Sequence, residues 1–218
     1  MSALYVYALS GRSTAPFTFQ GHRIEFVKFG TVRAAVERPA ERPAVSEAAL
    51  RTQHDIVMRI SASVDAVLPV RFGAFVGEEE LGQLVAMRRD VIERALDLVR
   101  GRVQMTARLR GQEASDAACP DVSPTVAAAT GTAYLEARRS AAARPLTPMA
   151  MSVAAAVRHL AVSEKVDSEA ARTSIAMYHL IDKGRVKDYK DALASLQSSA
   201  LTVTGPWPPF AFAPELWP

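Results

Sequence analysis

The chain has 218 residues, of which 49% are hydrophobic and 22% are charged, a globular composition that argues against wholesale disorder. Its 26 basic residues exceed the 23 acidic ones only slightly, for a net charge of +3, and they are scattered, unlike the basic patch of a nucleic-acid-binding protein. The single cysteine, Cys119, excludes an internal disulfide framework and a cysteine-based metal site, and predicts a reducing, cytoplasmic setting.

The N-terminal region predicts extended structure. Residues 3–9 (ALYVYAL) are strand formers with no basic segment before them, so we expect a strand buried on both faces and no signal peptide. Residues 24–29 and 32–36 predict two more extended segments, which pivot on Gly30 as a hairpin or a bent strand.

Two amphipathic helices are expected next. Ser46 as a cap and Glu47 in the first turn predict a helix of about five turns that ends near Ala66. Its apolar stripe, with His54 on the same face, is predicted to be Leu50, Val57, Ile60, Val64 and Val67. A strand is expected over residues 68–76 and a second, continuous helix over residues 78–99. The apolar stripe of that helix is predicted to be Leu81, Leu84, Val85, Val91, Ile92, Ala95, Leu96 and Val99.

The second half begins with a strand after Gly101. Residues 102–110 alternate apolar and polar side chains, which predicts a half-exposed antiparallel strand. Residues 111–129 predict a variable loop, and helical segments are expected over residues 130–143 and 149–160, interrupted by prolines. Strands over residues 162–166, 173–182 and 201–204, and a helix over residues 186–197, complete the chain.

These elements predict an α+β fold with two domains. Residues 1–100 have their own strands and two helices, enough for one core. Residues 101–218 follow the order βαββαβ of the ferredoxin-like fold, an antiparallel sheet with helices on one face, with the variable loop 111–129 and a tail, 205–218, rich in Trp and Pro. The longest apolar stretch, residues 149–157, is too short to span a membrane.

An arginine between apolar neighbours, Arg71, is the first candidate for binding. With Phe72 beside it, its planar fork could hold a carboxylate or carbonyl of a partner. It could equally pair within the chain, with an acid on a neighbouring helix or with free carbonyls, and we favour this internal pairing. Gly73 is expected to allow a bulge or a close backbone approach.

The stiff tail is the second candidate. Its proline-bound backbone could present Trp207 and Phe210 to a groove of a partner, or fold back so that Trp207 caps the protein's own core. We favour folding back for Trp207 and leave Phe210, Phe212 and Trp217 open. The candidate partner-binding residues are therefore Arg71, Phe72, Trp207, Pro208, Pro209 and Phe210.

No pattern in the sequence predicts catalysis. The four histidines lack metal-binding spacing, and neither a nucleophile elbow nor a glycine-rich phosphate loop is present. Cys119 has no basic neighbour to activate it. We therefore expect no catalytic residue, no cofactor and no metal.

Three motifs stand out along the chain: LPVRFG at residues 68–73, GTAYLEARR at residues 131–139 and LTVTGPWPPF at residues 201–210. Together they resemble the gas vesicle F/L family. The resemblance spans essentially the whole chain, although Gln104 stands where the family commonly has a glutamate and residues 176–183 are out of phase with a family strand. It implies a non-enzymatic accessory or structural protein of gas vesicle assembly, and hence of buoyancy. Such a protein binds the small hydrophobic shell protein and other accessory proteins through two α+β domains, the second a modified ferredoxin-like fold.

Two other functions are weighed against this one. An RNA-binding module fits a ferredoxin-like sheet, but such sheets stack bases on exposed aromatic residues, and the exposed face predicted for residues 102–110 has only Arg, Gln and Thr. A small-ligand enzyme comes third, because it needs a polar pocket that the sequence does not indicate.

Overall fold

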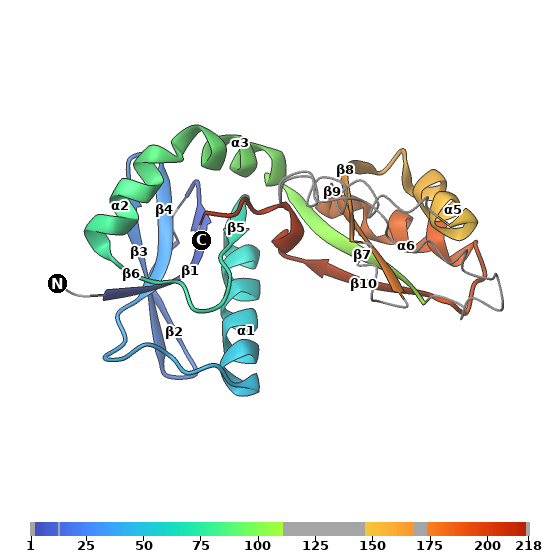
Figure 1. The fold of residues 1–218 in the computed structure, drawn as a ribbon. Coiled ribbons are helices and arrows are strands. Elements are labelled where there is room, and N and C mark those ends of the chain that lie inside the picture. The colour runs from blue at the N-terminus through green and yellow to red at the C-terminus, as the bar shows by residue number, and fades with distance from the viewer. Residues whose placement is uncertain (1–2, 13, 111–146, 168–173, 217–218) are drawn as a thin grey trace, which may run out of the picture. The chain divides into compact units, whose positions relative to one another are not determined.

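The computed structural model describes residues 3–12, 14–110, 147–167 and 174–216 (Figure 1). The chain forms two units: unit 1 contains Met1–Gln104, Leu180–Gly184 and Gly205–Pro218, and unit 2 contains Met105–His179 and Arg185–Thr204. The C-terminal tail thus lies with unit 1, although the sequence placed it in a domain that starts at residue 101. That residues 1–100 and 101–218 fold as separate domains stays a prediction. The expected loop 111–129, the helix 130–143, Cys119 and Trp217 lie outside the described residues.

Unit 1 is built on a six-stranded sheet with the order β2-β3-β4-β1-β5, in which β6 also pairs with β1. Its strands are β1 (Ala3–Ser10), β2 (Phe17–Phe19), β3 (His22–Phe29), β4 (Val32–Glu37), β5 (Val67–Pro69) and β6 (Phe75–Gly77). The buried strand expected over residues 3–9 is confirmed, and β3 and β4 form the expected hairpin at Gly30, with Phe29 opposite Val32. Strand β2 was not predicted. A two-residue turn at Gln20 and Gly21, both with positive φ, connects it to β3 as a type I′ hairpin requires.

Helix α1 (Glu47–Ser63) begins as expected, because the Ser46 side chain accepts a hydrogen bond from the Ala49 amide at 3.1 Å. It ends before Ala66, since Val64 is already extended. The predicted stripe is only partly right: Leu50 is 46% exposed. The buried residues of the helix are Gln53, Ile56, Val57 and Ile60.

The continuous helix expected over residues 78–99 is wrong. Two helices, α2 (Glu78–Met87) and α3 (Arg89–Val99), meet at Arg88, whose φ of −105° and ψ of 14° depart from helical geometry. Their buried residues are Leu81, Val85, Ile92, Leu96 and Val99. A stripe that continued without interruption from Val85 to Ile92 would pass positions 88 and 89, which are exposed arginines, so the break keeps both charges in water.

The helices of unit 1 cover both faces of its sheet. Helix α1 packs against the face that carries Tyr5, Tyr7 and Ile24. Helix α2 covers the opposite face, where a Cβ atom at Gly82 would meet the Phe29 ring at 3.4 Å. Because successive side chains of a strand point to opposite faces, Ile24 and Phe29 of β3 lie on different sides, as this arrangement requires.

The second sheet has the order β10-β7-β9-β8. Its strands are β7 (Arg102–Arg110), β8 (Ala161–Asp167), β9 (Ser174–Asp182) and β10 (Leu201–Trp207), so each expected strand is present. Helices α5 (Pro148–Val157) and α6 (Val186–Ala194) contact each other beside the sheet (Figure 1). The first and third strands of the βαββαβ series occupy the centre, as expected for a ferredoxin-like unit. Two short 3-10 helices, η1 (Lys183–Arg185) and η2 (Phe210–Phe212), complete the described elements.

Strand β7 differs from expectation on one point. Its polar face was predicted to be exposed, but Gln104 is 5% and Thr106 is 7% exposed. The side-chain oxygen of Gln104 accepts a hydrogen bond from the Ala211 amide at 2.7 Å, which offsets the cost of burying this amide side chain. An RNA-binding sheet would need the polar face of this strand to be exposed. Gln104 and Thr106 belong to that face, and both are buried.

A candidate partner-binding site

Residues 71–73 form a bulge in the strand that pairs with β1. Pro69 of β5 lies opposite Ala8, whereas Phe75 of β6 lies opposite Tyr5, so the register shifts between them. Backbone hydrogen bonds of 2.9 Å close the two sides of the bulge, one from the Val70 amide to the Tyr7 carbonyl and one from the Val6 amide to the Ala74 carbonyl. Residues 71–73, here called the bulge, are thereby excluded from the ladder.

Two buried side chains hold the bulge in place. The Tyr5 hydroxyl donates to the side-chain oxygen of Gln53 on α1, and it accepts a hydrogen bond from the Gly73 amide at 3.1 Å. Gln53 also donates through Nε2 to the Val70 carbonyl at 2.9 Å. Gly73 has a φ of 90°, which a residue with a Cβ adopts only under strain, so the bulge expected there is confirmed. Burial raises the pKa of Tyr5, so its hydroxyl stays protonated and able to donate.

The bulge presents Arg71 to solvent. The Arg71 side chain is 84% exposed and forms an ion pair with Glu215, which is 68% exposed. Arg71 is thus paired within the chain, but its partner comes from the tail and not from a neighbouring helix. Phe72 is half-buried and packs edge-on against Tyr5, with ring centroids 6.0 Å apart.

The tail, residues 205–216, folds back onto unit 1. Pro208 and Pro209 are buried and Phe212 is only 4% exposed, so these side chains belong to the fold in the free protein. Trp207 is half-buried, and its ring meets His54 of α1 edge-on at 5.5 Å. Phe210 stacks on the same histidine at 6.2 Å and remains 39% exposed.

The bulge, the tail and helix α1 meet in one region of unit 1. Gln53, which supports the bulge, is followed on α1 by His54, which contacts the tail. Leu50 lies one turn before His54 on the same flank of the helix and is 46% exposed. We call the surface of this region the docking surface, which consists of the exposed residues Leu50, Arg71, Phe210 and Glu215 and the half-buried His54.

Of the six residues predicted to bind a partner, Arg71 and Phe210 are exposed and Pro208 and Pro209 are not. Sequence reasoning missed Leu50 and Glu215. Leu50 was assigned to the buried stripe because its spacing to Val57 is helical, and only the position of α1 on the sheet shows that it points away. Glu215 carries no local signal, because its ion-pair partner lies in a distant segment.

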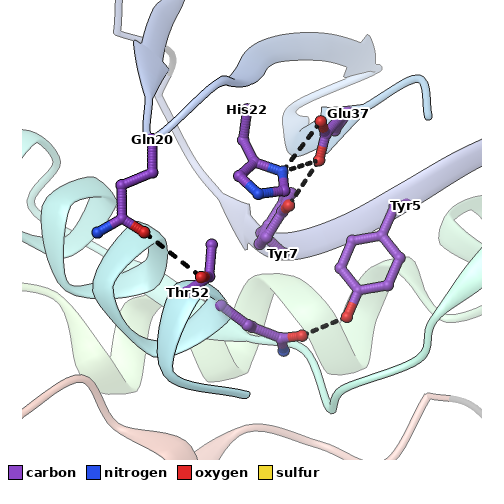
Figure 2. Close-up of polar contacts among 7 residues, drawn as sticks. Tyr5, Tyr7, Gln20, His22, Glu37 and Thr52 are labelled. Carbon is purple, nitrogen blue, oxygen red and sulfur yellow. Dashed lines mark hydrogen bonds and ion pairs between the residues drawn. The ribbon is translucent and has the colours of Figure 1, made fainter. Parts of the chain in front are cut away.

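A second polar cluster lies on the same face of the sheet (Figure 2). The Tyr7 hydroxyl donates to Oε2 of Glu37 at 2.7 Å, and Nδ1 of His22 lies 3.0 Å from the same oxygen. Burial, and the hydrogen bond to Glu37, raise the pKa of Tyr7. Thr52 of α1 also donates to the side chain of Gln20 at 3.4 Å. The first contacts join three strands to one another, and the hydrogen bond from Thr52 joins the β2–β3 turn to α1.

Unit 2 contains a buried histidine with two partners. Nδ1 of His179 lies 2.7 Å from the Tyr189 hydroxyl of α6, and Nε2 lies 3.1 Å from Oε2 of Glu164 on β8. Burial lowers the pKa of His179, and the Glu164 carboxylate opposes that shift. The cluster ties two strands to a helix.

Two further properties concern the described part of the chain only. Within residues 3–12, 14–110, 147–167 and 174–216, no group of three or more His, Cys, Asp or Glu side chains is placed to hold a metal ion. None of the helices in these ranges is long and apolar enough to cross a membrane.

The chain was compared with known proteins. The family model described as gas vesicle synthesis protein GvpL/GvpF matches residues 3–214. The fold is similar to the crystal structure of the gas vesicle protein GvpF from Anabaena sp. PCC7120, with 13% identity, a TM-score of 0.70, and 98% of this chain and 99% of that chain covered. It is also similar to the crystal structure of GvpF from Microcystis aeruginosa, with 10% identity, a TM-score of 0.70, and 98% and 100% covered. The comparison with curated proteins finds no match.

Proposed function

Because the chain belongs to the gas vesicle synthesis protein GvpL/GvpF family, we propose that it is a non-enzymatic accessory protein of gas vesicle assembly. In this role it binds the small hydrophobic shell protein and other accessory proteins, and it works in the cytoplasm in association with gas vesicles. The observation that carries the proposal is the family match over residues 3–214, which includes both units.

The docking surface is our proposal for where a partner binds. It combines two exposed apolar side chains, Leu50 and Phe210, with an exposed charge, Arg71. Aromatic side chains and arginine are enriched in protein–protein interfaces, and Phe210 and Arg71 are of these types, while Leu50 adds apolar area beside them. The bulge and the tail each hold their backbone by internal hydrogen bonds, which lowers the entropy lost when a partner binds.

A structural role for the polar clusters supports the non-enzymatic part of the proposal. Glu37 accepts from Tyr7 and contacts His22, while His179 contacts both Tyr189 and Glu164. In each cluster the side chains connect strands to one another or to a helix, which is a common use of buried polar groups.

The test is binding of the shell protein to the full chain. The double variant Leu50→Ala, Phe210→Ala is compared with wild type and with Met87→Ala, which removes a side chain that is 79% exposed on α2. We expect the double variant to bind the shell protein about tenfold more weakly or worse, because apolar anchors dominate such interfaces, and Met87→Ala to bind normally.

The same variants are then tested for formation of buoyant cells in a strain that lacks the protein. We expect the double variant to reduce buoyancy and Met87→Ala to preserve it. Equal binding by all three proteins would show that the docking surface is wrongly placed. Failure of the wild-type chain to bind any gas vesicle protein would overturn the proposed function itself.

A further inference from the structure

The ion pair between Arg71 and Glu215 joins the bulge, whose backbone is fixed, to an exposed side chain of the tail. The Arg71 backbone belongs to the bulge, whose position is set by Tyr5 and Gln53 and by a hydrogen bond of 3.0 Å from the Arg42 guanidinium to the Gly73 carbonyl. The planar arginine fork matches a carboxylate in shape and donates several hydrogen bonds to it. Because the backbone that carries the fork is already fixed, binding a carboxylate restricts only the freedom of the arginine side chain.

The tail is anchored by burial and hydrogen bonds up to Phe212, and beyond it Pro214 and Leu216 are half-buried. Phe212 is 4% exposed, the Ala211 amide donates to Gln104, and the amides of Phe212 and Ala213 donate to the Pro209 carbonyl at 3.0 and 3.1 Å. Glu215, by contrast, is 68% exposed in its ion pair. Ion pairs that are open to water shift an equilibrium by about fivefold or less, so Glu215 can leave Arg71 while the anchor at Phe212 stays in place.

We infer that Arg71 is a carboxylate receptor, which the tail residue Glu215 occupies in the free protein and which an acidic residue of a partner protein occupies in the complex. The binding segment of the partner carries a Glu or Asp next to apolar residues, as the tail does at Pro214, Glu215 and Leu216. The apolar neighbours would contact the exposed side chains of the docking surface. That the partner is a gas vesicle protein rests on the proposed function, whereas the receptor property rests on this chain alone.

The tail then acts as an internal competitor. Because Glu215 is tethered only three residues beyond the buried Phe212, its local concentration near Arg71 is high, and it weakens the binding of other acidic segments by up to about fivefold. A partner that also contacts Leu50 and Phe210 gains enough from those contacts to displace it. The receptor is thus selective for acids that come with an apolar anchor.

The experiment follows the arginine Nε signals of the full ¹⁵N-labelled chain by NMR. The Arg71 signal is identified by its absence from Arg71→Gln. The probes are the peptide acetyl-Ala-Pro-Glu-Leu-amide, which copies residues 213–216, and the same peptide with Gln in place of Glu. In Glu215→Gln, the Arg71 signal should shift with saturation on addition of the acidic peptide and stay in place with the Gln peptide. Wild type should bind the acidic peptide up to about fivefold more weakly, because Glu215 competes.

Arg23 serves as the matched control, since it is 77% exposed and pairs with Glu25 at 3.2 Å in the same unit, and its signal should not distinguish the peptides. Equal thermal unfolding of wild type and Glu215→Gln verifies the fold. An Arg71 signal that ignores both peptides, or follows both equally, overturns the inference. The peptide experiment contains no partner protein, so its failure leaves the proposed function standing. Failure of shell-protein binding, in turn, leaves the receptor result intact.

Discussion

The hydroxyl of Tyr5 on β1 donates a hydrogen bond to the side-chain oxygen of Gln53 on α1, and both residues are buried, at 2% and 6% exposure. The side-chain nitrogen of Gln53 donates a second hydrogen bond, to the carbonyl of Val70, the residue before the bulge. Buried polar groups cost free energy unless they are bonded, and here the strand, the helix and the bulge bond one another. The position of Arg71 therefore depends on two residues that are distant from it in sequence.

Tyr5→Phe should lower the free energy of unfolding by about 1–3 kcal/mol, because Gln53 and the Gly73 amide both lose a buried partner. Urea denaturation of the full chain measures the change. Tyr178→Phe, which removes a hydroxyl from a half-buried tyrosine of β9, is the control. A loss in Tyr5→Phe no larger than in the control would contradict the role of Tyr5.

Gly73→Ala should destabilise the protein by about 1–2 kcal/mol, because its φ of 90° is unfavourable for a residue with a side chain. Gly11→Ala is the matched substitution: the φ of Gly11 lies outside the left-handed region, and a Cβ atom there meets nothing within 4 Å. Thermal unfolding of both variants tests the difference. If Gly73→Ala is as stable as Gly11→Ala, the conformation of the bulge is not as described.

Phe212→Ala and Phe210→Ala should separate the contribution of the tail to stability from its proposed contribution to partner binding. Phe212 is 4% exposed, and its truncation should cost about 3–5 kcal/mol in unfolding free energy. Phe210 is 39% exposed, so its truncation should cost less than about 1 kcal/mol while weakening partner binding. Denaturation and binding are measured on the same preparations. Equal stability of the two variants would show that the tail does not pack through Phe212.

The buried His179 predicts lower stability in weak acid. Burial holds its native pKa below the ordinary value of 6.5, so below that pH the unfolded state binds more protons than the native state. The unfolding free energy should therefore be fully present above pH 6.5 and fall as the pH is lowered toward 5. His179→Gln should flatten this dependence, and His159→Gln, which changes an exposed histidine of the same unit, should retain it. An unchanged slope in His179→Gln would assign the pH dependence to other groups.

The sequence correctly predicted those helices and strands that depend on interactions between neighbouring residues. The Ser46 cap, the alternation in β7 and the short apolar run of β1 each depend on neighbouring residues, and the structure places an element at each. The break at Arg88 was missed because no proline or glycine marks it. Strand β2 was missed because three residues carry too little periodicity to be recognised.

Burial on a given face was harder to predict than the elements themselves. Leu50 and Ile56 both fit a helical stripe, and the choice between them depends on how α1 is rotated against the sheet. Gln104 and Thr106 were assigned to solvent by their polarity, yet both are buried, and Gln104 bonds to the tail backbone.

By itself, the sequence determined the α+β class, the order of most strands along the chain and the family, because strand and helix periodicity and contiguous motifs are properties of neighbouring residues. Only the tertiary structure decided that the tail belongs with the N-terminal unit, that Arg71 meets Glu215 and that His54 lies between Trp207 and Phe210. Those contacts join segments far apart in the chain. Their free energy arises when a folded core brings the segments together, so no local pattern encodes them.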